Sequence, residues 1–532
     1  MKALVATLLL AVGLVTTGCG STNETKDETA NTSPSAVTED SLGVDRETSM
    51  VIRATADAKV VHPLYANDRL SLTLVNNIFA PLARRDGIAI REGILAESIE
   101  TSSDFLTYTV KLKKDLKWHD GKAITADDLI FTCETIADPN QGSHLVDTFK
   151  MPDGTPIKIA KVDDLTVTFT LPSPQVDYIA SIADIRPFPK HVYENIDNIQ
   201  KSDVAQKPVG SGPYKFESVK AGENWILAKF DDYVMGTPQI NHVVYRIIPD
   251  ATTAQFAFEN GEIDSMYVFP ENVEKLKSKG STIMTFDEDR VGYLLINQNN
   301  EFLKNKDIRQ AICYAINREE LIMAKYMSMD YAKPAKSFLA EKAMYLNNEV
   351  EPYDYNPEKA KDLVKKSGLS NVKLNLVYIG KNDTQELMVK QYLEAVGIQV
   401  NLKAMEFGAF YDALFNPAEN KEYDLAFNGY IYGQLPSSYA NVFMTGSPEN
   451  VNNYSNTKVD DLFKAAAIET DNAKREQMYK EIQKIVIDDA SMYPVEYGYA
   501  LVAANPRIKG LDKAVPASIY MFEDLSKAYI EK

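Results

Sequence analysis

Residues 372–402, VKLNLVYIGKNDTQELMVKQYLEAVGIQVNL, carry the clearest fold signal in the chain. The first part alternates apolar and polar residues as a β-strand does, which puts Leu374, Leu376 and Tyr378 on one face. The middle part has helical spacing, with apolar residues at Leu387, Met388, Tyr392 and Leu393. Alternation returns after Gly397, at Ile398, Val400 and Leu402. A strand, a helix and a strand with short links predict a parallel βαβ unit, and therefore an α/β lobe.

Two helix starts upstream of this unit are marked by capping residues. Asn356-Pro357 supplies an N-cap asparagine and a proline at the first helical position, and Gly368 ends that helix. Asn317 stands three positions before Glu320, which is the spacing of a capping box. From residue 50 onward the chain alternates between strand and helix patterns, so the α/β class extends over the whole body.

The size and charge of the chain limit its domain count and its partners. It has 532 residues, which is too long for one compact core, so two or three domains are expected. A hydrophobic content of 45% fits a globular body. The net charge of -18 repels phosphate backbones, and nucleic acid is therefore not an expected partner.

The N-terminus has the pattern of a secretion signal. Lys2 is followed by an apolar run, Ala3 to Val15, that is too short to span a bilayer. Thr16-Thr17-Gly18-Cys19 then resembles the lipobox of bacterial lipoproteins, with Thr16 more polar than the residue usual there. Residues 1–18 are predicted to be a lipoprotein signal peptide, and Cys19 the lipidated first residue of a mature protein on the extracytoplasmic face of the cell membrane. Residues 19–49 are polar and are predicted to be a flexible tether.

The remaining cysteines and the histidines give no sign of a reactive or metal-binding centre. Cys133 and Cys313 each lie in an apolar helical pattern, which favours buried free thiols over a disulfide. The histidines have no spacing typical of metal ligands, and no nucleophile elbow, P-loop or dinucleotide fingerprint occurs. No catalytic residue, metal site or cofactor is predicted, and an enzyme such as a secreted hydrolase is the minority hypothesis.

Several segments, taken in order, resemble a known family. Leu116 to Phe131, LKWHDGKAITADDLIF, is similar to the W-x-D-G-x-x-x-T-A-x-D signature of extracellular solute-binding protein family 5, the peptide- and nickel-binding lipoproteins of ABC importers. Further segments agree in the order of the family: His62-Pro-Leu64, Val209 to Tyr214, Asn260 to Asp264, Asp307 to Arg318, Tyr355 to Lys361 and Gly397 to Val400. The resemblance covers residues 50 to 525 and is greatest for oligopeptide-binding proteins.

The resemblance implies a two-lobe periplasmic-binding-protein fold of the large peptide-binding class (type II), with two crossing segments between the lobes and an extra domain inserted in lobe one. Carried onto this sequence, lobe one comprises residues 50–85, 207–288 and 498–532. The inserted domain comprises residues 86–206, and lobe two residues 289–497. The lobes are expected to close around the ligand.

The resemblance also implies where a ligand binds. In peptide-binding members an extended ligand pairs main chain to main chain with a short segment from each lobe. The segment in lobe one corresponds to Asn67, Asp68 and Arg69. The segment in lobe two lies in the stretch from Asp424 to Gly433, with expected contacts at Phe427, Gly429, Tyr430, Ile431, Tyr432 and Gly433, and Phe407 completes the set. A core strand is the alternative interpretation of this stretch, above all for Leu425 and Phe427.

The sequence departs from the family at one position of this site. Many peptide binders have an aspartate where this chain has Gly433, and that aspartate pairs with the terminal ammonium group of the ligand. Three explanations remain open: another carboxylate replaces it, the ammonium lies outside the pocket, or the ligand is not a free peptide. Asp68 is the first candidate for a replacement, a hypothesis that unchanged peptide affinity in Asp68→Asn would contradict.

The resulting functional expectation is a lipid-anchored, monomeric peptide receptor that delivers its ligand to the permease subunits of an ABC transporter. The same role for a metal chelate or an oligosaccharide is the alternative within the family, and an adhesin is a less favoured alternative from another class. The sequence does not define the length or the side chains of the ligand.

Overall fold

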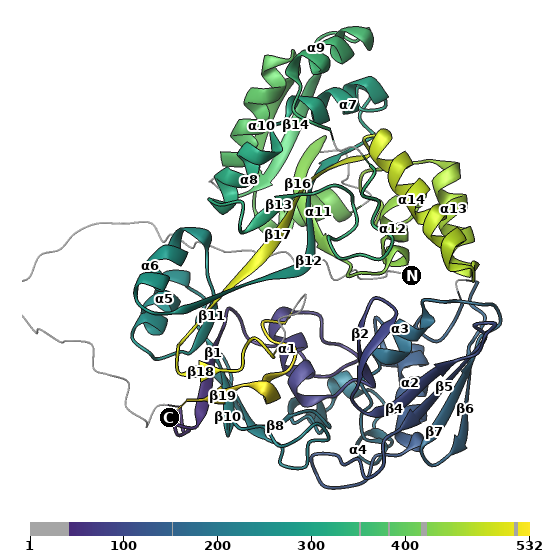
Figure 1. Cartoon of the computed structure of the whole chain (residues 1–532), viewed down its shortest axis with the longest axis vertical. Helices are drawn as coiled ribbons and strands as arrows, with labels where there is room; N and C mark the ends of the chain where they lie inside the picture. The colour runs from purple at the N-terminus through teal and green to yellow at the C-terminus, as the bar shows by residue number, and fades with distance from the viewer. Residues whose placement is uncertain are drawn as a thin grey trace, which may run out of the picture.

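We describe the protein from a computed structural model, which covers residues 42–151, 153–350, 353–380, 384–416, 423–514 and 520–531 (Figure 1). The predicted signal peptide, Cys19 and the tether up to residue 41 lie outside these residues. Among the described residues, no helix is long and apolar enough to cross a membrane.

A sheet of eleven strands, counted over the described residues, runs through both halves of the molecule. Its order is β15-β14-β16-β12-β17-β11-β1-β10-β9-β8, and β13 pairs with β17 beside this path. The bounds are β1 Ser49–Ala54, β8 Tyr214–Lys220, β9 Asn224–Lys229, β10 His242–Ile247, β11 Ser265–Tyr267, β12 Thr282–Ile296, β13 Ala332–Pro334, β14 Lys373–Ile379, β15 Gln399–Met405, β16 Leu425–Ile431 and β17 Met492–Ala504.

Lobe one is built on the strands from β11 to β8. Strand β1 pairs in parallel with β10 and β11, and β8, β9 and β10 form an antiparallel set. Three helices belong to this part: α1 Arg69–Ile78, α5 Ala251–Glu259 and α6 Val273–Ser278. The C-terminal segment returns here with the short pair β18 Ile508–Lys509 and β19 Tyr529–Ile530. Lobe one therefore contains both the start and the end of the folded body.

A second, four-stranded antiparallel sheet with order β4-β5-β7-β6 lies beside lobe one, at the lower right of Figure 1. Its strands are β4 Ala96–Thr101, β5 Thr107–Leu112, β6 Lys158–Asp163 and β7 Thr166–Thr170. It is accompanied by the hairpin β2 Ala83–Asp86 and β3 Ala89–Gly93 and by α2 Ala126–Ala137, α3 Tyr178–Ala183 and α4 Lys190–Tyr193. This sheet falls within the segment expected to be an inserted domain.

Lobe two contains the predicted βαβ unit. Strands β14 and β15 pair in parallel around α10, Thr384–Ala395, so the prediction from the opening stretch is confirmed. The other helices are α7 Lys306–Ala315, α8 Arg318–Tyr326, α9 Pro357–Lys366, α11 Phe407–Phe415, α12 Ala440–Phe443, α13 Thr457–Ile468 and α14 Asn472–Asp488. The expected apolar face of α10 needs one correction, because Leu387 is exposed and the buried residues of this helix are Val389 and Leu393.

The sheet of lobe two is buried on both faces. Along β12, Val291, Tyr293 and Leu295 pack into one apolar cluster, and Leu294 and Ile296 pack into another. Successive side chains of a strand point to opposite faces, so a strand covered on both sides has apolar residues throughout. This accounts for the continuous apolar run from Val291 to Ile296, apart from Gly292.

Strands β12 and β17 form the connection between the lobes, as the teal and yellow ribbons of Figure 1 show. Their antiparallel ladder runs from Thr282↔Ala504 to Asp287↔Tyr499, is interrupted, and resumes at Val291↔Tyr497. Residues 288–290 therefore stand opposite Gly498 alone, which makes a bulge in β12, and bulges bend the strand that carries them. The bend lies between the two halves of the sheet.

The predicted helix caps and the predicted state of the two cysteines are both found in the structure. Asn356 accepts from the Lys359 backbone N–H at 3.0 Å, and Asn317 accepts from the Glu320 backbone N–H at 3.3 Å, as predicted for α9 and α8. Cys133 and Cys313 are both buried and free.

The end of the predicted tether differs from the structure. Val44 is buried, and Arg46 pairs with Asp264 at 2.8 Å, so the chain joins lobe one a few residues before residue 50.

Candidate functional site

A cavity of about 920 Å³ lies between the two lobes. Lobe one and the neighbouring four-stranded domain contribute residues such as Asn76, Arg84, Arg91, His144 and Arg186. The crossing strand β12 contributes Asp287 and Asp289, and lobe two contributes Lys342, Gly433 and Gln434. A cavity of this size is in the range of small-molecule sites.

The two lobes also touch each other beside the cavity. The Ser437 hydroxyl of lobe two donates to the Asp177 carboxylate, which belongs to the segment of the four-stranded sheet, at 2.6 Å. Gly87 lies so close to Met344 that a Cβ at Gly87 would be 2.7 Å from the Met344 sulfur. The cavity is therefore bounded by contacts between the lobes.

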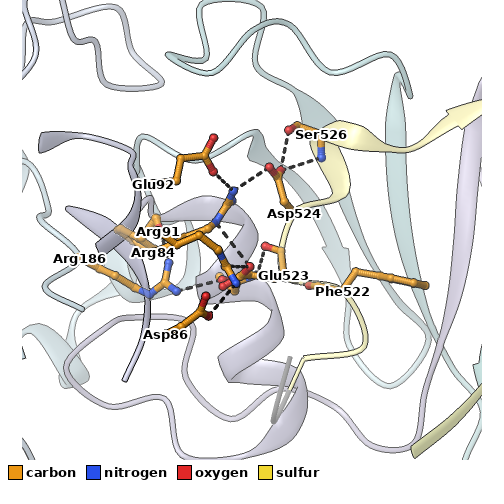
Figure 2. Close-up of polar contacts among 11 residues, drawn as sticks. Arg84, Asp86, Arg91, Glu92, Arg186, Phe522, Glu523, Asp524 and Ser526 are labelled. Atoms are coloured by element: carbon orange, nitrogen blue, oxygen red, sulfur yellow. Dashed lines mark hydrogen bonds and ion pairs between the residues drawn. The ribbon is translucent and has the colours of Figure 1, made fainter. Parts of the chain in front are cut away.

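The wall of lobe one is a network of paired charges, shown in Figure 2. The buried Arg84 guanidinium lies 2.8 Å from Asp524 and 3.1 Å from Glu92. Arg91 lies 3.1 Å from Asp86 and also pairs with Glu523. Burial raises the pKa of Glu523, although Arg84 and Arg91 oppose that rise. These charges stabilise one another, and the C-terminal segment supplies two of the carboxylates.

Arg186 differs from the other arginines of this wall. Its guanidinium donates to the Asn76 side-chain oxygen at 2.9 Å and to the Phe79 carbonyl, which are both neutral groups. It forms no ion pair with any residue that the structure describes. The Arg186 charge still lowers the pKa of the nearby Glu523 carboxyl, so Arg186 belongs to the same network of charges.

Strand β12 brings two carboxylates to the cavity at its bulge. Asp287 Oδ1 accepts from the Asp289 backbone N–H at 2.8 Å, and its Oδ2 is buried. Burial raises the pKa of Asp287, and the Asp289 N–H and Lys342 oppose that rise. Neither aspartate is predicted as a site residue from the sequence, because the run Phe-Asp-Glu-Asp-Arg at residues 286–290 is typical of a solvated turn. The available signal was the sudden loss of alternation in an otherwise apolar strand.

The wall of lobe two is formed by the end of β16 and the turn that follows. Tyr430 is buried, and its hydroxyl donates to the Phe338 carbonyl at 2.5 Å. Tyr432 donates to Glu449 at 3.0 Å, and the Gly433 carbonyl accepts from Tyr439 at 2.9 Å. Gly433 has φ +71°, and no atom lies within 4 Å of the place where its Cβ would be. Of the predicted contacts, Gly433 lines the cavity, and Tyr430 and Tyr432 lie directly before it.

Strand β16 has an incomplete ladder on one side. Strand β12 pairs with all of it, from Leu425 to Ile431. On the opposite edge, β14 pairs only with Leu425 and Ala426, and residues 427–431 have no ladder partner there among the described residues. This free edge includes the predicted contacts Phe427, Gly429, Tyr430 and Ile431.

The side chains of several predicted contacts have structural roles. Phe427 packs against the apolar cluster on one face of lobe two, and Phe407 is an exposed residue at the start of α11. A Cβ at Gly429 would lie 2.7 Å from the Arg290 guanidinium, so a larger residue here would displace the end of the Arg290 side chain.

The three predicted residues of lobe one lie at the start of α1. Asn67 is exposed, and Asp68 caps the helix by accepting from the Ser71 backbone N–H at 2.9 Å and its hydroxyl at 2.5 Å. Arg69 donates to the Tyr267 hydroxyl at 2.6 Å and lies 3.3 Å from Glu288. None of the three is among the residues that line the cavity.

The described residues hold no cluster of three or more histidine, cysteine, aspartate or glutamate side chains that could bind a metal ion. The cavity offers hydrogen-bonding groups and charges of both signs.

Comparisons with known proteins agree with this architecture. The model of the bacterial extracellular solute-binding proteins, family 5, matches residues 92–453. The crystal structure of the ABC transporter substrate-binding protein CtaP from Listeria monocytogenes is 40% identical, covers 91% of this chain and 99% of that one, and has a TM-score of 0.88.

Two relatives known by sequence are also similar along most of their length. The dipeptide-binding protein of Escherichia coli is 27% identical over 82% of this chain and 85% of its own. The oligopeptide-binding protein AppA of Bacillus subtilis is 26% identical over 89% of this chain and 90% of its own. The expected two-lobe fold is confirmed.

Proposed function

The chain belongs to the bacterial extracellular solute-binding proteins of family 5, and we propose that it captures peptides outside the cytoplasm and delivers them to an ABC transporter permease. Two of the similar proteins are named for binding dipeptides and oligopeptides, and a third is an ABC transporter substrate-binding protein. The family is one of solute-binding proteins, and the role proposed is binding without catalysis.

The observation that carries the proposal is the cavity of about 920 Å³ that both lobes line. A ligand in such a place contacts both lobes at once, so it stabilises the arrangement in which they touch. The bulge in β12 and the contact between Ser437 and Asp177 fit a protein whose lobes close by rotation at the crossing strands. The lobe limits that we propose are those expected from the sequence, except that lobe one begins a few residues before residue 50.

The free edge of β16 supports a peptide in particular. An extended peptide adds to such an edge through its main chain, which gives affinity without regard to sequence. Residues 427–431 present this edge, and Gly433 with its neighbour Gln434 lines the cavity directly after it. The contacts proposed in lobe two are therefore main-chain contacts, which fits the buried side chain of Tyr430.

We further propose that the mature protein is monomeric and is held at the extracytoplasmic face of the membrane by lipid on Cys19. The support is the sequence alone, since the apolar run and the Thr-Thr-Gly-Cys motif resemble a lipoprotein signal. A tether of about 25 residues spans roughly 30 Å and would hold the body just above the membrane.

The test is to purify the mature full-length chain gently from membranes and to identify by mass spectrometry what denaturation releases. A ladder of peptide masses is expected. A single non-peptide mass or a metal complex would contradict the peptide ligand, and protein that is empty and binds no peptide in titration would do the same. The Cys19→Ala variant should leave the membrane fraction, with Cys133→Ala as the matched control.

A further inference from the structure

Asp287 carries a buried carboxylate oxygen that lacks a hydrogen-bond donor. Its Oδ1 accepts from the Asp289 backbone N–H at 2.8 Å. Its Oδ2 accepts from no residue that the structure describes, although the side chain is only 5% exposed. Leaving a buried acceptor unsatisfied is unfavourable, and more so when the acceptor is charged. An unsatisfied acceptor in the wall of a ligand cavity is suited to accept a hydrogen bond from the ligand.

The charges that surround Asp287 do not satisfy this oxygen. The Lys342 ammonium lies 3.8 Å from Oδ2, beyond hydrogen-bonding distance, and its side chain is 63% exposed to solvent. Lys333 is held by Glu341 at 2.7 Å, so these two neighbours largely cancel each other. Asp289 adds a second carboxylate to the same wall. These two carboxylates make the part of the cavity next to the bulge favourable for a cationic group.

The position of Asp287 in the fold allows it to contact one end of a bound ligand. It is the last ladder residue of β12 before the bulge, so it lies where the two lobes join. Gly433 of lobe two lines the same cavity and has no side chain to fill the space next to its Cα. Asp287 thus supplies a carboxylate to the same cavity in which position 433 has none.

We propose that Asp287 binds the terminal ammonium group of the ligand and takes over the role of the aspartate that is absent at position 433. This rests on the proposed peptide-binding function. An ammonium group donates three hydrogen bonds, and a charge-assisted bond to a buried carboxylate is about twice as strong as a neutral one. Asp68, the candidate from the sequence, is less suited, because both of its oxygens already accept bonds that cap α1.

The experiment measures the affinity of alanine peptides of two to nine residues, with free or acetylated N-termini, by calorimetry at pH 7. The unaltered protein is compared with Asp287→Asn and with Asp184→Asn, which removes an exposed carboxylate from the same cavity. Acetylation and Asp287→Asn should each weaken binding about 10- to 100-fold. Acetylation should have little further effect in Asp287→Asn, and Asp184→Asn should respond to acetylation like the unaltered protein.

Two results would overturn the inference, and they differ in what they leave standing. If the unaltered protein binds free and acetylated peptides equally, or if Asp287→Asn keeps the full preference for a free amine, Asp287 does not bind the ammonium and the peptide function stands. If the unaltered protein binds none of the peptides, the inference and the proposed function both fail.

Two further measurements keep the result independent of folding defects. The acetylation arm needs no variant at all, and Asp287→Asn keeps the acceptor for the Asp289 N–H, so its thermal unfolding should match the unaltered protein. Adding Gly433→Asp to Asp287→Asn should restore about tenfold of the lost affinity for free-amine peptides, because the space at Gly433 is open. Gly433→Asn in the Asp287→Asn background is the control, because it places a side chain at the same positive φ without a charge. It should not restore the affinity.

Discussion

The two walls of the cavity use charge in opposite ways. On lobe one, Arg84 and Arg91 are held by carboxylates of the hairpin β2–β3 and of the C-terminal segment, as Figure 2 shows. On the other side, Gly433 of lobe two lines the cavity together with Asp287 of the crossing strand, whose Oδ2 has no hydrogen-bond donor among the described residues. Charges that pair closely within the protein fix its structure, and a buried carboxylate oxygen without a hydrogen-bond donor is available to a ligand. The contrast predicts that changes on the first wall affect stability and changes on the second affect binding.

The largest effect is expected from breaking the paired wall. Arg84→Met leaves Asp524, which is 2% exposed, without its cation and should lower the free energy of unfolding by about 3–5 kcal/mol. Urea unfolding followed by tryptophan fluorescence measures this directly, since Trp118 and Trp225 both lie in the first half of the chain.

The matched control is Arg85→Met, because Arg85 pairs with the exposed Asp184 and such pairs contribute about 0–1 kcal/mol. Equal losses in the two variants would contradict the assignment of the Arg84 network as structural.

A smaller difference between the lobes is expected in how their free energy of unfolding depends on acidic pH. All five histidines lie before residue 289, and burial lowers the pKa of the fully buried His62 to about 3. Between pH 6.5 and 3 the unfolded chain binds a proton at His62 that the folded protein excludes. Stability is therefore lost as the pH falls, by about 1.4 kcal/mol per unit and by about 2 kcal/mol at pH 5.

His62→Phe should reduce this dependence between pH 7 and pH 5 without abolishing it, because burial also lowers the pKa of His119 to about 4. Urea unfolding with tryptophan fluorescence measures the change. The aromatic neighbours Tyr65, Phe79, Phe188 and Tyr193 favour phenylalanine as the replacement. His242→Phe, at a partly exposed histidine, is the control. An unchanged slope in His62→Phe would show that another group is responsible.

The smallest effect concerns the contact that joins the walls. Ser437→Ala removes the hydrogen bond to Asp177, which is worth about 0.5–1.5 kcal/mol, so ligand affinity should fall about 2- to 10-fold. Stability should change little, because each lobe keeps its own core. Calorimetry with a peptide that copurifies measures the effect, and Ser438→Ala, at the exposed neighbouring serine, is the control. Equal affinities in the two variants would show that this contact does not stabilise the closed arrangement.

Local features of the fold could be predicted from the sequence, and contacts between distant segments could not. The unit β14-α10-β15 and the caps of α8 and α9 follow from patterns a few residues long. Arg84 and Asp524 pair although they are 440 positions apart in the sequence, and no local pattern predicts this contact. The two-lobe architecture could be predicted only from the family resemblance, which rests on the order of the motifs.

The candidate site shows the same limit. Gly433 was found because the family has an aspartate there, and it does line the cavity. Asp287 was missed, because its importance comes from a bulge and from burial by other segments, neither of which is visible in a run of acidic residues. Leu387 was placed on the wrong face of α10, since helical spacing alone does not tell which side meets the core.

The central place of β17 in the large sheet has a consequence for how a newly made chain folds. Lobe two is a continuous segment, so all of its strands are available once β17 begins. In lobe one, β11 pairs with the last residues of β17, and Asn76 of α1 bonds to the Glu523 carbonyl. The first lobe to be synthesised is thus the last to be completed, and β11 keeps one edge unpaired until nearly the whole chain has emerged.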